Sequence, residues 1–165
     1  MSDIIKDTIL GIDVGHDGAL VFYRDGRWTV VDMPTIGNGK KRQKRELNCA
    51  AIYALLREHG PIKHAYIEHA GAMPRQGVAS MFSFGRTFGA LQMALAALDI
   101  PHTIVTSRAW KKAAGIPSGA DKEAGRRRAL QLFPGEVANL ARAKDHGRAD
   151  AMLLAHFGPT LRVQP

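Results

Sequence analysis

The sequence predicts an α/β fold, a mixed five-stranded sheet with helices packed on its faces. Three short β-branched runs separated by tight turn signals open the chain, and two further short apolar runs alternate with helical patterns. Neither an internal repeat nor a linker interrupts the 165 residues. The expected order is β-β-β-α-β-α-β-α-α-α, with three antiparallel strands followed by two parallel ones. A chain of this length is expected to form one domain over residues 1–165.

The first part of the chain is predicted to form an antiparallel meander of three strands. A β-branched apolar run over residues 8–14 ends at Gly15 and predicts the first strand. Asp17-Gly18 and Asp25-Gly26 are strong hairpin signals, which place the second and third strands over residues 19–24 and 28–33. A loop is expected from 34 to 45.

Helices and strands then alternate. Apolar residues at a helical period predict a helix over 46–59, closed by Gly60-Pro61, and the lone cysteine, Cys49, is interpreted as a core residue of it. The other expected elements are a strand over 63–68, a flexible Gly/Ala/Pro-rich loop over 70–79, a helix over 80–98 with Ser80 as its cap, a strand over 102–106, a short helix from 107 or 108 to 114, a basic helix over 121–132 capped by Asp121, and a last helix over 147–157.

The charge balance indicates an acidic partner. Lys and Arg number 23 against 15 Asp and Glu, a net charge of +8 with a pI near 10.0. Three clusters favour a phosphate backbone over solvated surface or acidic lipid. They are Lys40, Lys41, Arg42, Lys44 and Arg45; Arg108, Lys111, Lys112, Lys122, Arg126, Arg127 and Arg128; and Arg142, Lys144 and Arg148. One cysteine excludes an internal disulfide or a Cys-based zinc site, and no apolar stretch approaches the roughly 20 residues of a membrane span, so a cytoplasmic location is expected.

Three acidic residues occur at the ends of apolar strands or within an apolar helix, where apolar side chains would be expected. Asp13 ends the first strand, Glu68 ends the fourth, and Asp150 lies within the apolar stretch of the last helix. Because the first and fourth strands are expected to be neighbours, the three carboxylates would meet, and a hard divalent cation would relieve their repulsion. Taken singly, each has another interpretation: a turn residue, an edge charge, or an ion-pair partner of Arg148 or Lys144.

Several stretches, in this order and spacing, resemble the RuvC-type Holliday junction resolvases of the ribonuclease H-like superfamily. They are Gly11-Ile12-Asp13-Val14-Gly15, Gly18-Ala19-Leu20, Tyr66-Ile67-Glu68, Phe88-Gly89-Ala90-Leu91, Val105 to Lys112, Asp121-Lys122-Glu123 leading to Leu132-Phe133-Pro134, and Gly147-Arg148-Ala149-Asp150-Ala151. The last is similar to the final motif of phage-encoded members. The resemblance implies a homodimeric, Mg²⁺-dependent endonuclease that cuts four-way DNA junctions with paired nicks, in the cytoplasm of a bacterial or phage-infected cell.

The resemblance also implies the site residues. Asp13, Glu68 and Asp150 would ligate the metal, two Mg²⁺ ions per site being expected and Mn²⁺ possible as a substitute. Family members carry a fourth ligand three residues before the last Asp, where this chain has Gly147. His146, four residues before Asp150 and on the same helical face, is favoured as the fourth ligand, with Asp145 as its rival. Asp145 could instead cap the last helix.

DNA contacts are expected on basic and loop residues, which are Lys40, Lys41, Arg42, Met73, Arg75, Gln76, Lys111, Lys112 and Lys122. Met73 is a hypothetical wedge at the junction centre. Phe82, Phe84 and Phe88 are interpreted as core or dimer interface, and Gly85 and Gly89 would permit close helix approach. The remaining alternatives are a ribonuclease H-like nuclease on other branched DNA or RNA–DNA hybrids, an inactive nucleic-acid-binding module and, with little support, an actin-like ATPase.

Overall fold

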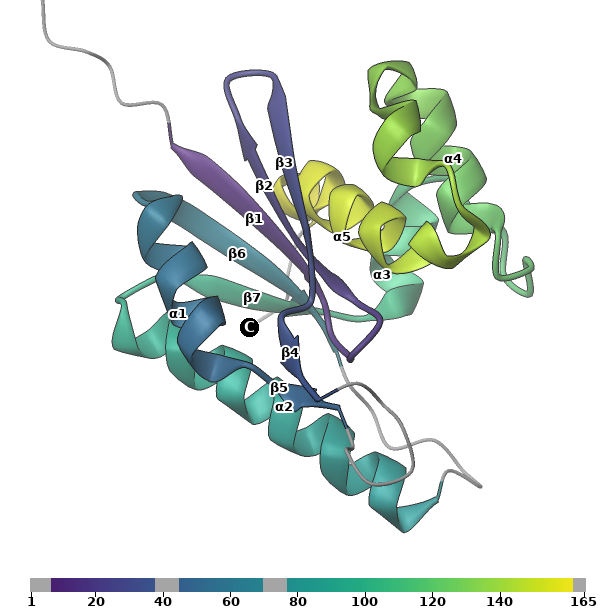
Figure 1. Cartoon of the computed structure of the whole chain (residues 1–165). Coiled ribbons are helices and arrows are strands. Elements are labelled where there is room, and N and C mark those ends of the chain that lie inside the picture. Colours follow the sequence, from purple (N-terminus) through teal and green to yellow (C-terminus); the bar gives the residue numbers. More distant parts are fainter. Residues whose placement is uncertain (1–6, 38–44, 70–76, 162–165) are drawn as a thin grey trace, which may run out of the picture.

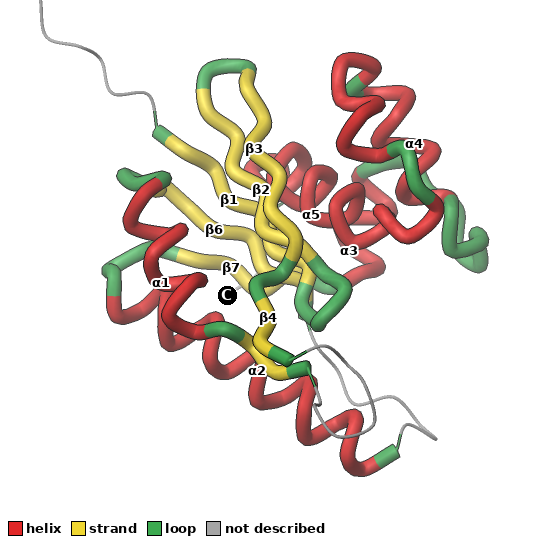
Figure 2. Tube along the Cα trace, viewed as in Figure 1, coloured by secondary structure: helices red, strands yellow, loops and turns green. Residues whose placement is uncertain are grey.

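A computed structural model of the chain describes residues 7–37, 45–69 and 77–161. Its centre is a five-stranded sheet in the order β3-β2-β1-β6-β7 (Figures 1 and 2). The strands are β1 (Thr8–Asp13), β2 (Ala19–Arg24), β3 (Arg27–Asp32), β6 (Ile62–Glu68) and β7 (His102–Val105). The first three are antiparallel, whereas β6 pairs in parallel with β1 and β7 in parallel with β6. The predicted mixed sheet is therefore confirmed.

The β2–β3 turn follows from its two residues. Asp25 and Gly26 both adopt positive φ, 54° and 76°. A two-residue hairpin turn whose twist matches the strands needs this conformation at both central positions, which Asp-Gly adopts more easily than most pairs. The turn signal read from the sequence is confirmed at this position.

The helices form two layers, one on each face of the sheet (Figure 1). On one face, α1 (Cys49–Glu58) and α2 (Val78–Ala97) bury a core centred on β1 and β6. On the other, α5 (His146–Phe157) packs with α3 (Ser107–Ala113) and α4 (Ala124–Leu132) around Trp110. Gly11 of β1 allows α5 to approach closely, because a Cβ there would collide with the backbone of Ala151 and Ala155.

Several element boundaries differ from the sequence prediction. Residues expected in a loop and at a helix start form a small second sheet, in which β4 (Thr35–Ile36) pairs with β5 (Glu46–Leu47). The helix begins only at Cys49 because the Asn48 side chain accepts a hydrogen bond from Ala51 N at 3.1 Å and caps it there. Cys49 then lies on the solvent side of the first turn, exposed, and its interpretation as a core residue is wrong.

Other boundaries shift by a few residues. α2 begins at Val78 with Gly77 as its cap, so Ser80 is not the cap. α4 begins at Ala124, and Asp121 instead accepts the Glu123 N–H at 2.8 Å just before it. Two 3₁₀ helices, η1 (Pro134–Leu140) and η2 (Ala143–Asp145), fill the segment before α5, and η3 (Gly158–Thr160) follows it. No helix within the described ranges is long and apolar enough to cross a membrane.

Candidate active site

The carboxyl ends of β1 and β6 bring two of the predicted acids side by side. Ile12 pairs with Ile67 in the parallel register, so Asp13 and Glu68, each the last residue of its strand, are neighbours. Their side chains lie within hydrogen-bonding reach of each other. Asp150 approaches from α5, the helix seated on β1, and its charge acts on Asp13. The structure thus brings Asp13 and Glu68 together, with Asp150 near enough for its charge to act on Asp13, and a shared metal site of the three acids stays a prediction.

Electrostatics show that the negative charge of this group is undercompensated. Burial raises the pKa of Asp13 well above its ordinary value, and the charges of Glu68 and Asp150 raise it further, against a smaller lowering by Lys111. Burial, followed by the charge of Glu68, raises the pKa of Asp150 to about 7, again opposed by Lys111. Desolvated, mutually repelling carboxylates of this kind are stabilised by a bound cation.

The donor chemistry fits a hard divalent cation. Carboxylate oxygens are the ligands that Mg²⁺ and Mn²⁺ prefer. Within residues 7–37, 45–69 and 77–161, however, no three His, Cys, Asp or Glu side chains are gathered closely enough to hold a metal ion. Binding would therefore require the acidic side chains to draw together, which their shared repulsion opposes in the absence of the cation.

Two donors hold Glu68, and the sequence predicted no role at the site for either of them. The Ser107 hydroxyl donates to Glu68 Oε1, and Trp110 Nε1–H donates to the same oxygen at 3.2 Å. Both donors belong to α3, and Trp110 is fully buried. Their separations from Glu68 of 39 and 42 residues explain why local sequence patterns could not reveal them.

The two candidates for a fourth ligand have different surroundings. Asp145 is only 2% exposed, and Arg142 binds it through its backbone N–H at 2.8 Å and its guanidinium at 2.6 Å. Burial would raise the pKa of Asp145, but these bonds and the nearby charge of Arg148 outweigh burial and lower it. The side chain thus closes a capping box with Arg142 around η2, and makes no side-chain cap on α5.

His146 shares a cavity with one of the acids. It lines the same cavity as Asp150, and its charge acts on Asp17 in the β1–β2 turn. Close packing explains why position 147, where the resemblance expects a metal ligand, is a glycine. A Cβ at Gly147 would press against the Asp17 carbonyl oxygen and stand 2.9 Å from Asp13 Oδ2, so α5 packs too tightly there for a side chain.

A basic cleft of about 890 Å³ leads to Asp150 and His146. The basic residues that line it are Arg108, Lys111, Lys112 and Lys122, and the lining also includes residues 115–121 with Ala124 and Gly125. The predicted contacts Lys111, Lys112 and Lys122 therefore share one cavity with an acid of the site. Lys40, Lys41, Arg42, Met73, Arg75 and Gln76 lie outside the described residues.

The arginines of α4 have partners within the chain. Arg126 binds Glu123 at 2.7 Å and the Leu140 carbonyl at 2.9 Å, Arg127 binds Asp121, and Arg128 binds the Ala114 carbonyl at 2.7 Å. These bonds fix α4 against the loop and η1. Arg148 does not pair with Asp150, which was the other interpretation of that acid. Its guanidinium instead donates two hydrogen bonds to Asp32, at 2.6 and 2.7 Å.

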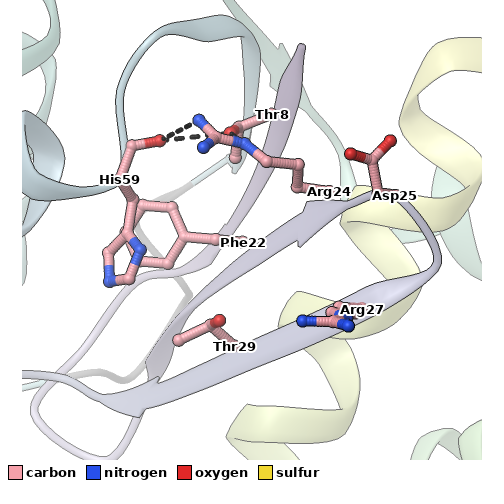
Figure 3. A pocket seen from close by; sticks show the side chains of 7 residues that line it. All are labelled: Thr8, Phe22, Arg24, Asp25, Arg27, Thr29 and His59. Carbon is pink, nitrogen blue, oxygen red and sulfur yellow. Dashed lines mark hydrogen bonds between the residues drawn. The ribbon is translucent and has the colours of Figure 1, made fainter. Parts of the chain in front are cut away.

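A second cavity, of about 430 Å³, lies at the opposite end of β1, beside Thr8 (Figure 3). Arg24 crosses it and donates to Thr8 Oγ1 at 2.7 Å and to the carbonyls of His59 and Gly60 at 2.9 and 3.0 Å. The His59 ring stacks on Phe22, 4.2 Å between centroids. Arg24 thus ties β2 to the end of α1, away from the acids.

Comparisons with known proteins agree with this architecture. No protein-family model matches the chain. It is 27% identical to the chloroplastic Holliday junction resolvase MOC1 of Chlamydomonas reinhardtii over 151 aligned residues, covering 78% of this chain and 17% of that relative's length. RuvC of Thermus thermophilus superposes with a TM-score of 0.55 at 16% identity, covering 93% of this chain and 96% of RuvC.

Two further solved structures share the arrangement. Thermus thermophilus RuvC in complex with a Holliday junction substrate has a TM-score of 0.54 at 15% identity, with the same coverage of 93% and 96%. The yeast mitochondrial Holliday junction resolvase Ydc2 has a TM-score of 0.55 at 14% identity, covering 91% of this chain and 76% of Ydc2. The chain therefore has the ribonuclease H-like fold of RuvC, as the sequence predicted.

Proposed function

We propose that this protein is a structure-selective endonuclease that resolves four-way DNA junctions by metal-dependent hydrolysis, placing paired nicks. The observation that supports it most is the pairing of Asp13 with Glu68 at the carboxyl ends of β1 and β6, with Asp150 acting on Asp13 from α5 and lining a basic cleft. The likeness of this chain to RuvC and to a Holliday junction resolvase supports a four-way junction as the substrate.

Mg²⁺ is the proposed cofactor, two ions per site, with Mn²⁺ able to replace it. Asp13, Glu68 and Asp150 would hold the metal, and His146 is favoured over the arginine-bound Asp145 as a fourth ligand. A bound ion pair of this kind activates water and stabilises the leaving oxygen of a phosphodiester. Arg108, Lys111, Lys112 and Lys122 would bind the phosphates of the strand entering the cleft.

A homodimer would bring two such sites to one junction, and the outer face of α2 is the surface we assign to it. Val78, Phe82 and Met93 are 79%, 68% and 67% exposed and recur at helical spacing along one stripe. Gly85 and Gly89 continue the stripe, with open space above them. Phe84 and Phe88, by contrast, pack against the core. Exposed apolar stripes of this length are typical of protein interfaces.

The dimer can be tested separately from catalysis. Phe82→Asp should convert a dimer to a monomer in analytical ultracentrifugation, with little change in Tm because the side chain is mostly exposed. Val137→Asp, an exposed apolar residue on η1, is the matched control and should leave the mass unchanged. A wild-type chain that sediments as a monomer at micromolar concentration would exclude this use of α2.

The activity test offers the wild type a synthetic four-way junction, a linear duplex and an RNA–DNA hybrid side by side. We expect Mg²⁺-dependent cleavage of the junction, lost in Asp13→Asn, Glu68→Gln and Asp150→Asn while junction binding survives. Cleavage of the hybrid instead would identify a ribonuclease H-like enzyme. Binding without cleavage across a range of Mg²⁺ and Mn²⁺ concentrations would identify an inactive DNA-binding module.

We place the protein in the cytoplasm of a bacterial or phage-infected cell. Cys49, the single cysteine, is free and exposed, which suits a reducing compartment. Detection of the tagged protein in a fractionated host cell tests this assignment, and recovery in the membrane fraction would contradict it.

A further inference from the structure

One oxygen of Glu68 receives both hydrogen bonds from α3. Ser107 is the first residue of this helix and Trp110 lies three residues later, so both donors reach the same oxygen from one helical face. The helix start is fixed by Thr106, whose hydroxyl accepts the Ala109 N–H at 3.2 Å. Trp110 is held in the core, so its N–H cannot turn away without opening that core.

These two bonds occupy the acceptor capacity of Glu68 Oε1. A carboxylate oxygen has two lone-pair sites, and the Ser107 O–H and the Trp110 N–H account for both. A cation that approaches Glu68 would therefore meet the other oxygen, Oε2. The side chain is presented to the site as a ligand with one available oxygen and a fixed orientation.

We propose that Ser107 and Trp110 are positioning residues that restrict Glu68 to one-oxygen ligation of the divalent cation and thereby favour Mg²⁺ over Ca²⁺. Ca²⁺ takes six to eight oxygens and uses two-oxygen carboxylates readily, whereas Mg²⁺ takes six in strict octahedral geometry. Because Oε1 is occupied by hydrogen bonds, Ca²⁺ would lose one coordinating oxygen, whereas the affinity for Mg²⁺ would change little. This inference rests on the metal site of the proposed function.

Calorimetric titration of the full chain without DNA, with Mg²⁺ and separately with Ca²⁺, tests it. In Ser107→Ala and in Trp110→Phe, which keeps an aromatic ring but loses the N–H, the Kd for Ca²⁺ relative to that for Mg²⁺ should fall about tenfold, the size of typical outer-shell effects. Ser107→Thr retains the hydroxyl and should restore the wild-type ratio. Thr103→Val removes a different hydrogen bond, the one between the Thr103 hydroxyl and His64 Nε2, and is the matched control.

The outcomes separate this inference from the proposed function. If the wild type binds neither ion, the metal site itself is wrong. If the wild type binds Mg²⁺ and Glu68→Gln abolishes binding, but both α3 variants keep the wild-type ratio, only the positioning role is overturned. A fall in Tm with an unchanged ratio of the Ca²⁺ and Mg²⁺ Kd values would assign Ser107 and Trp110 to folding alone. Because two variants are measured, the test still works if one of them does not fold.

Discussion

Replacing Asp150 with Asn should stabilise the metal-free protein at neutral and alkaline pH. The pKa of Asp150 is raised from 3.8 to about 7, chiefly by burial. The folded state therefore binds the proton more tightly than the unfolded state between these two values, so the free energy of unfolding falls as pH rises through that window. Each pKa unit corresponds to about 1.4 kcal/mol, so Asp150 lowers the free energy of unfolding, relative to a side chain that is always neutral, by about 4 kcal/mol at pH 8 and about 2 kcal/mol at pH 5. At pH 8 the cost is that of ionisation in the folded state, whereas at pH 5 it is that of proton uptake on folding.

Urea unfolding in EDTA at pH 5 and pH 8 measures this difference. The gain in unfolding free energy of Asp150→Asn over the wild type should be about 4 kcal/mol at pH 8 and about half that at pH 5. Asp121→Asn, an exposed carboxylate paired with Arg127, is the control and should show little change at either pH. A variant no more stable than the wild type at pH 8, or a gain independent of pH, would refute the assignment of Asp150 as a desolvated, uncompensated acid.

Three further results are expected. Gly147→Ala should lower the free energy of unfolding by about 1–3 kcal/mol in urea titrations, because its Cβ meets Asp13 and the Asp17 backbone; wild-type stability would contradict this packing. Asp32→Asn removes the ion pair with Arg148 and one of its two hydrogen bonds, because the amide NH2 cannot accept; since Asp32 is 63% exposed, calorimetry should show a loss of about 1 kcal/mol or less. Lys122→Ala should reduce the dependence of log K for junction binding on log salt by about 1, and an unchanged slope would remove Lys122 from the phosphate contacts.

The sequence predicted the elements whose signals are local. Asp25-Gly26 specifies its own turn, and the order of strands makes β1 and β6 neighbours, which was enough to bring Asp13 and Glu68 together. Cys49 was misjudged because periodicity alone cannot say which face of a helix the first turn presents. The Asn48 cap shifts the helix start by three residues relative to the expected one.

The remaining details depend on contacts between distant residues. Arg126, Arg127 and Arg128 look alike in sequence, yet each finds a different partner in the folded chain, and only the fold shows that they hold α4 in place. Ser107 and Trp110 lie in the stretch Val105 to Lys112 that resembles the resolvases, but nothing in that stretch predicts a contact with a carboxylate on another strand. Charge counting therefore located the basic region but could not separate side chains free to contact DNA from those used within the protein.

The glycine at position 11 has a consequence for how the acids can gather around a cation. Because α5 rests directly on the backbone of β1 there, the main-chain separation of Asp13 and Asp150 is set by contact between two rigid elements. Contact between the two backbones therefore prevents α5 from moving closer to β1 at this point. Uptake of the proposed cation would then proceed through side-chain rotation, which is fast and leaves the sheet unchanged, and we expect the occupied and empty sites to share one backbone.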